Sequence, residues 1–495
     1  MKKIFLDIRN YILLVGFIFS LVSCDSLLEE SPTSFISPEK FYNTEADAFT
    51  AIAGIYGTLS GYNLFSRDLE MMTAHGDPAV SSNRRLEYAA SRYAETANFG
   101  DIANIWKHFY IMIGDANKAA AKIKKGNLEQ DKKDQYYGEA LFLRAIAYYY
   151  LTALFGDVPL WVDELTNNSD EIASLSRTDV TKVREQIIKD LTEAYNLLPD
   201  SYDGDFDKVR ATKWAAKSLM AKTYLYMKKW TDAADAAKDV MDNSNHILLD
   251  DYSDIFTMYN EYNDEIIFTL DYKEELNGTG RGLRWGVRSG NESAANREDW
   301  MTGYAHYVLR QSFINTYDTS DDRLRAIIFD KNLKGNQLNF VYLGKNQRTE
   351  DRLHKEGINF ILLRLADIIL VHAEATNEAG DQQAALKSLN MVRHRAKIAD
   401  RTSSDQNELR EMIRLERRQE LIGENQSKID LMRWGTLVEE VKALPEKSAA
   451  AGEHSNLQTV AALQAEGISS KNLLFPIPEA EFSKNPSLGS QNPGW

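Results

Sequence analysis

Apolar residues recur at intervals of three and four through most of the chain, the spacing that places them on one face of an α-helix. The first such stretch starts near residues 43–44, where Glu45 and Asp47 would lie in the first turn and complement the helix dipole. The same spacing predicts helices within 102–125, 135–155, 177–198, 213–242, 364–396 and 411–434. Gly156 and Pro199 follow two of these segments and are typical helix stops. The pattern therefore predicts a mainly helical protein.

Two of these segments, 213–242 and 364–396, each fit a pair of antiparallel helices with small residues where the two helices meet. Their spacing resembles that of a tetratricopeptide repeat. More than 100 residues separate them, whereas tandem repeats of this kind recur about every 34 residues. A simple solenoid is therefore excluded.

Two long polar stretches without helical rhythm interrupt the pattern, near 60–100 (the first insertion) and near 245–350 (the second insertion). Both exceed the ~12–15 residues of an ordinary loop, which indicates a function or local structure of their own. We therefore predict an all-α fold in which residues 24–495 form one domain. Its scaffold of tetratricopeptide-like hairpins would lie within about 43–240 and 360–435.

The amino terminus has the pattern of a bacterial export signal. A basic start is followed by an apolar run from Tyr11 to Val22. As a helix this run would span about 18 Å, too short to cross a hydrocarbon core of about 30 Å. Cys24, the only cysteine in the sequence, follows Leu21, Val22 and Ser23, an arrangement that resembles a lipoprotein signal. We expect residues 1–23 to be a signal peptide and Cys24 to carry a lipid anchor; an ordinary signal peptide with an incidental cysteine is the alternative.

The charge balance narrows the class of partner. The chain has a net charge of −15, and loss of residues 1–23 would make it more acidic, because that segment carries three basic residues and one acidic residue. An excess of acid argues against nucleic-acid binding, which relies on Lys and Arg to neutralise phosphates. It also argues against adhesion to anionic lipid, so we expect membrane contact through the anchor alone.

Sequence motifs of catalysis are absent. The chain has no HExxH, GxSxG or P-loop motif, and the Gly-rich residues 278–282 neither follow a predicted strand nor open a predicted helix. His75 and Asp77 could bind a metal, but a polar turn is the simpler interpretation. The 73 acidic residues leave glycoside hydrolysis by two carboxylates open, although nothing selects a pair. We predict no catalytic residue, no metal site and no cofactor.

Several motifs, in order along the chain, are similar to those of the SusD/RagB family of outer-membrane, glycan-binding lipoproteins. They are CDSLLEESP from Cys24, LRAIAYYYLTALFGDVPL (143–160), LLRLADIILVHAEATNEAG (362–380), RLERRQELIGENQSKIDLMRWG (414–435) and FPIPEAEFSKNPSLGSQNPGW (475–495). The fourth motif departs from the family where Asn425 replaces a usual Gly and Lys428 a usual aromatic residue.

The resemblance implies an α-helical fold built on four tetratricopeptide-like hairpins. It also implies a cell-surface lipoprotein that binds oligosaccharides and passes them to a TonB-dependent, SusC-like transporter. The helical scaffold would contact the transporter, the insertions would hold the ligand, and no catalysis is implied. Three alternatives remain: peptide cargo, a cell-surface glycan hydrolase, and a structural scaffold without a small ligand.

Aromatic side chains in the insertions are candidates to stack on sugar rings. Trp106, Trp214, Trp230 and Trp434 lie in strongly periodic segments, where we expect a core role, and we expect Trp495 to anchor the carboxyl terminus.

Trp285 and Trp300 lie in a stretch rich in Gly, Arg and Asn, where ligand binding competes with a local packing role. Tyr304 would share a helical face with Trp300. The resemblance adds Asp77, Asn83 and Arg85 from the first insertion. Tyr62 and Phe65 are weaker candidates.

Overall fold

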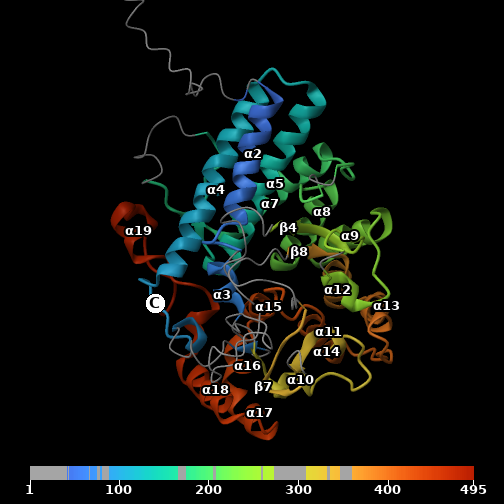
Figure 1. The fold of residues 1–495 in the computed structure, drawn as a ribbon. Helices are drawn as coiled ribbons and strands as arrows, with labels where there is room; N and C mark the ends of the chain where they lie inside the picture. Colours follow the sequence, from blue (N-terminus) through green and yellow to red (C-terminus); the bar gives the residue numbers. More distant parts are fainter. Residues whose placement is uncertain are drawn as a thin grey trace, which may run out of the picture.

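The protein is mostly helical, which confirms the predicted fold class (Figure 1). The computed structural model describes residues 42, 44–65, 67–74, 79–80, 89–164, 174–204, 208–257, 260–272, 308–331, 335–345 and 359–495. All structural statements below concern these residues.

Four long helices stand side by side at one end of the molecule (Figure 1). They are α2 (Glu45–Leu59), α4 (Gly100–Lys125), α5 (Gln130–Phe155) and α7 (Val180–Leu197). The start of α2 is where the sequence predicts it, because Thr44 and Asp47 form a capping box. The Thr44 hydroxyl accepts a hydrogen bond from the Asp47 backbone N–H (3.2 Å), and the Asp47 carboxylate accepts one from the Thr44 N–H (3.0 Å). Helix α5 is buried on all sides over its second half, so it forms the centre of this layer.

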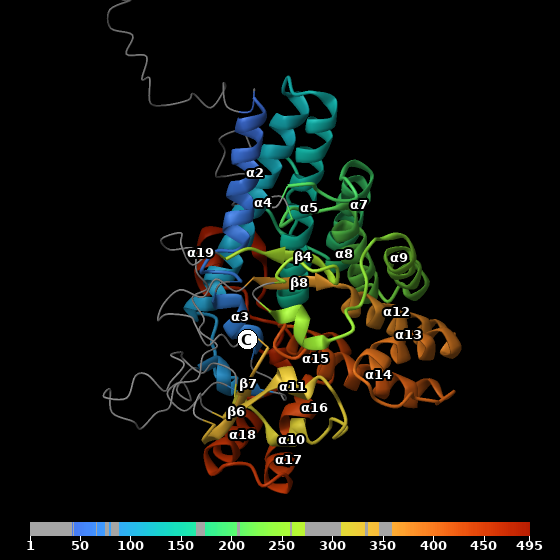
Figure 2. The same ribbon diagram turned by 45° about the vertical axis from the view of Figure 1, so that its right-hand side comes forward.

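The two predicted hairpins are neighbours in space. One is α8 (Lys213–Tyr226) with α9 (Trp230–Asn243), and the other is α12 (Leu365–Ala379) with α13 (Gln382–Arg395). Helix α9 packs directly on α12, although more than 100 residues of chain separate them (Figure 2). Because α7 also packs on α8, and α14 (Gln406–Glu420) on α12, one continuous helical array runs from α4 to α14.

Shorter elements complete the fold. The helices are α3 (Asp68–Ala74), α10 (Gln311–Ile314), α11 (Leu324–Ile327), α15 (Ser427–Trp434), α16 (Leu437–Lys442), α17 (Leu444–Ala450), α18 (Ser455–Gly467) and α19 (Glu479–Lys484). The 3-10 turns are η3 (Ala89–Arg92), η5 (Tyr252–Phe256), η7 (Ser470–Leu473) and η8 (Pro486–Leu488).

Within the described residues, strands form small antiparallel sheets. One has the order β1-β5-β7-β6, and the other two pair β2 with β3 and β4 with β8. The bounds are β1 (Ala79–Val80), β2 (Val158–Pro159), β3 (Arg177–Thr178), β4 (Ile266–Leu270), β5 (Val308–Leu309), β6 (Ile328–Lys331), β7 (Gln337–Leu343) and β8 (Phe360–Arg364). Several of these strands, and α3, fall in the stretches that lack helical rhythm, so both insertions contain local structure.

A buried ion network, which we call the Glu420 cluster, joins the helical array to the strands. Its members are Glu265, Arg323, Arg364, Arg395, Glu420 and Glu424. Glu420 accepts hydrogen bonds from Arg364 (2.6 Å), Arg323 (3.0 Å) and Arg395. Arg364 also pairs with Glu265 (2.9 Å) and Glu424 (2.7 Å). Burial raises the pKa of Glu420, but Arg395 and Arg364 outweigh it and hold that pKa well below its usual value.

We expect Arg364→Met to destabilise the protein by roughly 3–5 kcal/mol, because three buried carboxylates would lose their shared partner. Urea unfolding followed by circular dichroism measures the loss. The matched control is Lys238→Met, which removes an ion pair with Asp242 on the exposed face of α9 and should cost at most about 0.5 kcal/mol. Equal losses in the two variants would contradict a structural role for the cluster.

Candidate functional site

The functional residues singled out from the sequence lie outside the described part of the chain. They are Cys24, Asp77, Asn83, Arg85, Trp285, Trp300 and Tyr304. Their roles stay predictions.

The structure does show how the two insertions are anchored to each other. Strand β1, inside the first insertion, pairs with β5, inside the second, so that Ala79 lies opposite Leu309 and Val80 opposite Val308. Strand β5 in turn pairs with β7, where Val308 lies opposite Tyr342. Backbone hydrogen bonds therefore join two segments that are more than 200 residues apart in the sequence.

Helix α18 supports this sheet from the carboxyl-terminal part of the chain. Val308 and Tyr342 form a buried apolar cluster with Leu457 and Val460 of α18. Because these four side chains are buried together, α18 holds the sheet at the point where the two insertions meet.

The two weaker aromatic candidates have different environments. Phe65 is fully buried and packs against the rings of Tyr150 and Phe360, with centroids 5.1 and 5.3 Å away. Phe65 is therefore a core residue, and its assignment as a candidate ligand contact is wrong. Tyr62 is 55% exposed, with the Arg67 guanidinium 5.3 Å from its ring centroid, and it remains a candidate.

The predicted core tryptophans divide into two groups. Trp106 and Trp214 are buried, as expected. Trp230 and Trp434 are only partly buried: they pack against the main hydrophobic core, as expected, but they also line a cavity at its edge. Helical spacing predicts that the apolar face of a helix packs against the rest of the protein. It does not show whether neighbouring side chains fill all the volume beside that face or leave a cavity. The indole N–H of Trp495 donates to two backbone carbonyl groups, which anchors the carboxyl terminus as predicted.

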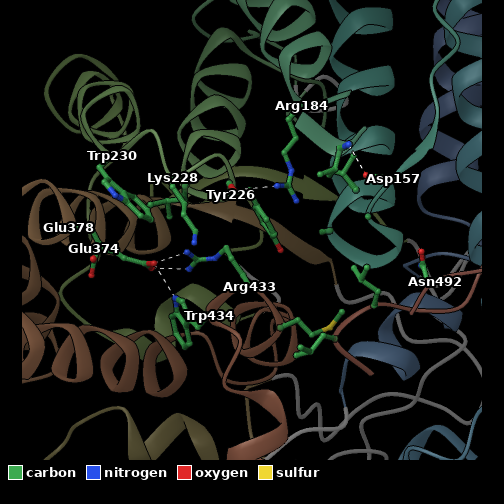
Figure 3. A pocket seen from close by; sticks show the side chains of 18 of the residues that line it. Asp157, Arg184, Tyr226, Lys228, Trp230, Glu374, Glu378, Arg433, Trp434 and Asn492 are labelled. Carbon is green, nitrogen blue, oxygen red and sulfur yellow. Dashed lines mark hydrogen bonds and ion pairs between the residues drawn. The ribbon is translucent and has the colours of Figure 1, made fainter. Parts of the chain in front are cut away.

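The cavity lined by Trp230 and Trp434 has a volume of about 590 Å³ (Figure 3). It lies where α5 ends and α7 begins, beside the α8–α9 turn, and it is closed by α12, α14, α15 and the carboxyl-terminal segment. This volume falls within the range of roughly 300–1,000 Å³ that is typical of small-molecule sites. The helical array thus contains a pocket whose described lining includes no residue of the β1–β5 sheet.

One side of this cavity is electrostatically satisfied. Arg433 makes a bidentate ion pair with Glu374, at 2.6 and 2.8 Å, and the Trp434 indole N–H donates to the same carboxylate at 3.0 Å. The guanidinium groups of Arg414 and Arg433 lie over the Trp434 ring, 5.2 and 5.3 Å from its centroid. Cations therefore already stack on this indole.

Burial acts against the Glu374 carboxylate, but its neighbours dominate. Desolvation raises the pKa of Glu374, while Arg433 and Arg417 lower it, and the net result is a pKa of about 2. Glu374 is therefore ionised whenever the protein is folded near neutral pH, and it serves the cavity as the fixed partner of Arg433.

The two departures from the family's fourth motif have local explanations. Asn425 has a φ of +56°, a left-handed conformation that Gly and Asn adopt more easily than other residues. The buried Lys428 ammonium donates to the Met72 carbonyl (2.8 Å) and lies 5.0 and 5.4 Å from the ring centroids of Tyr93 and Phe475. A cation thus takes part in an aromatic cluster.

Comparison with protein-family models identifies the class to which this fold and these motifs belong. Residues 330–495 match the model described as "SusD family", and residues 27–225 match one described as "Starch-binding associating with outer membrane". The chain belongs to the SusD family.

Relatives and solved structures agree with that assignment. The chain is 28% identical to "SusD-like protein P25" of Formosa agariphila over 490 residues, which cover 89% of this chain and 92% of that protein. A SusD homologue from Bacteroides thetaiotaomicron superposes with a TM-score of 0.80 at 22% identity, over 92% of this chain and 98% of that one. A structure described as a laminarin-binding SusD-like protein gives a TM-score of 0.73 at 25% identity, over 92% of this chain and all of that one.

Two kinds of feature are absent from the described residues. None of the helices there combines the length and apolar character needed to span a membrane. No group of three or more His, Cys, Asp or Glu side chains in that part of the chain could hold a metal ion.

We expect the free energy of unfolding to fall as the pH drops from about 5 to 2. The pKa of Glu374 is about 2 in the folded protein and ordinarily 4.5, so the unfolded chain takes up the proton first. This carboxyl alone contributes about 3 kcal/mol of stability above pH 5 that is lost by pH 2. Urea titrations across this range test the expectation.

Glu374→Gln should be less stable than wild type at pH 7 but lose less stability between pH 5 and 2. The control is Glu411→Gln, which replaces a carboxylate that is 69% exposed and should keep the wild-type pH profile. An unchanged profile in Glu374→Gln would show that the carboxyl titrates normally.

Proposed function

We propose that this protein captures oligosaccharides at the cell surface and delivers them to a TonB-dependent, SusC-like transporter in the outer membrane. Membership of the SusD family supports the role, as do the names of similar proteins: one matching family model is described as starch-binding and associated with the outer membrane, and one similar structure as laminarin-binding. The protein would act as a binder without catalysis.

The observation that carries this proposal is the pairing of β1 with β5. Asp77 lies two residues before β1 in the sequence, Asn83 lies three residues after it, and Tyr304 lies four residues before β5. The two insertions that carry the candidate residues therefore start from one sheet. We propose that Asp77, Asn83 and Arg85 act with Trp285, Trp300 and Tyr304 on one ligand.

We propose a separate role for the insertions, for the helical array and for Cys24. Stacking on an indole ring recognises the apolar face of a sugar, and the neighbouring polar side chains would bind its hydroxyl groups. The packed helical array would contact the transporter, and a lipid on Cys24 would tether the protein to the membrane.

We expect residues 25–495 to be retarded in native gels that contain one or a few of a panel of polysaccharides, with no sugar released. Trp285→Ala and Trp300→Ala should each weaken the retardation at least about tenfold in apparent affinity, because stacking on an aromatic side chain is lost. The matched control is Phe49→Ala, which removes an aromatic ring that is 48% exposed on the scaffold helix α2.

Three other outcomes of the gel experiment would contradict part of the proposal. Retardation that survives both Trp substitutions would leave glycan binding intact and reject these two residues. Release of sugar would indicate a hydrolase. Absence of retardation on every glycan, with binding of peptides, would favour peptide cargo.

Cys24→Ala should abolish incorporation of labelled fatty acid and move the protein from the membrane fraction to the soluble fraction of the producing cell. The reason is that no other lipid attachment site exists for a thiol-linked anchor, since Cys24 is the only cysteine in the sequence. Membrane fractionation with a Ser23→Ala control measures the effect. A Cys24→Ala protein that stays in the membrane fraction would contradict the anchor.

A further inference from the structure

The cavity between the helical array and the carboxyl-terminal segment carries an excess of positive charge. Its described lining contains the basic residues Arg177, Arg184, Lys228, Arg410, Arg414 and Arg433, and the acidic residues Asp157, Glu374 and Glu378. The whole chain has a net charge of −15. A local basic excess in an acidic protein is a feature that attracts an anion.

Ion pairs neutralise only part of this charge. Arg433 is paired with Glu374, Arg410 with Glu378 and Arg414 with Glu411. These three cations need no further partner.

Arg184 and Lys228 differ from them, because no carboxylate within the described residues lies at ion-pair distance from either. Arg184 donates one hydrogen bond to the Tyr226 carbonyl (3.2 Å), and its guanidinium lies 4.7 Å from the centroid of the Tyr226 ring. Lys228 is exposed in the α8–α9 turn, with a φ of +55°. Both side chains line the cavity, Arg184 from the α7 side and Lys228 from the opposite side (Figure 3).

The environment of Arg184 is unfavourable for an unpaired cation. Burial lowers the pKa of its guanidinium below the usual value. Burial acts on Arg433 in the same direction, but Glu374 and Asp430 raise its pKa well above the usual value. An anion in the cavity would give Arg184 a negatively charged partner, as Glu374 does for Arg433.

Arg177 provides a third cation whose partners are neutral. Its guanidinium donates to the carbonyl groups of Asp157 and Ser490, both at 2.8 Å, and to the side chain of Asn492. Each of its three nitrogens already donates a hydrogen bond, so we assign it long-range attraction rather than a direct contact.

We propose that this cavity binds an anionic saccharide, with the carboxylate of a uronic acid or the sulfate of a sulfated sugar held between Arg184 and Lys228. The partly buried Trp230 ring, on the same side as Lys228, offers an apolar surface to the sugar ring. That the anionic group belongs to a saccharide rests on the proposed function. That the cavity binds an anion rests on Arg184 and Lys228 in its lining.

An acidic peptide fits the same cavity less well. Asp157 and Glu378 also line it, and they would repel a run of carboxylates while still accepting hydrogen bonds from sugar hydroxyl groups. One oxyanion surrounded by neutral hydroxyl groups matches the two unpaired cations better than several carboxylates do.

Calorimetric titration of residues 25–495 at low ionic strength tests the proposal. The probes are glucuronate, galactose monosulfate, the uncharged sugars glucose and galactose, and the dipeptide acetyl-Glu-Glu-amide. At least one charged sugar should bind about tenfold or more tightly than its uncharged counterpart. Which of the two binds distinguishes a carboxylate site from a sulfate site, and salt should weaken the binding.

Arg184→Gln and Lys228→Gln should each weaken that binding at least about tenfold, because each removes a charge-assisted hydrogen bond. The matched controls are Lys182→Gln, on the exposed face of α7, and Lys229→Gln, next to Lys228 but outside the cavity lining. Both should bind as wild type. Lys228 is exposed, so its variant should fold normally, which a thermal melt of each protein checks.

The proposal is overturned if the charged and uncharged sugars bind equally, if neither charged sugar binds, if the dipeptide alone binds, or if the control variants lose as much affinity as Arg184→Gln and Lys228→Gln. The protein with both Trp285→Ala and Trp300→Ala should still bind the charged sugar. That comparison separates failure of the cavity from failure of the glycan site proposed in the insertions.

Discussion

The structure depends on charges that are buried where its two parts meet. Glu420, at the carboxyl end of α14, contacts Arg364 at the end of β8, Arg395 at the end of α13 and Arg323 just before α11. Each of these side chains is almost inaccessible to water. A buried charge is tolerated only when partners replace its hydration. The positions of these elements are therefore constrained, because each must bring its charged side chain into the cluster. The hydrophobic core supplies most of the stability, and the cluster sets the relative position of array and strands.

Helix α14 uses Arg417, three residues before Glu420, for a second network, which reaches the cavity. Arg417 pairs with Asp367 and Asp430, both at 3.0 Å, and Asp367 also pairs with Lys222. Asp430 and the cavity residue Glu374 both pair with Arg433. The cavity therefore lies at the edge of a continuous ionic network, whose members are satisfied on the inner side. Its unpaired cations come from α7 and the α8–α9 turn, which this network does not reach.

Local features of the fold could be predicted from the sequence, and long-range ones could not. The capping box at Thr44, the two hairpins and the anchored Trp495 all follow from short-range patterns. The charged residues around Arg417, Arg418 and Glu420 indicate a salt-bridged helix, but nothing in a single sequence shows that Arg323 and Arg364 are buried against Glu420. Strands β1 and β5 are two residues long, too short for an alternating pattern. The cavity escaped prediction because its lining comes from many separate elements, spread from α5 to the carboxyl-terminal segment.

The same contrast explains how one scaffold can serve different ligands. Between the ends fixed by β1–β5 and β4–β8 pairing, the sequence of an insertion is not constrained by the described members of either ionic network. The cavity is the opposite case. Its walls are the array itself, and a change at Glu374 would remove the bidentate partner of the buried Arg433 and leave it only the ion pair with Asp430. Under the two proposals, ligand preference in the insertions can diverge without changing the array, whereas a preference in the cavity would change at residues such as Arg184 and Lys228, which the described ionic networks leave unpaired.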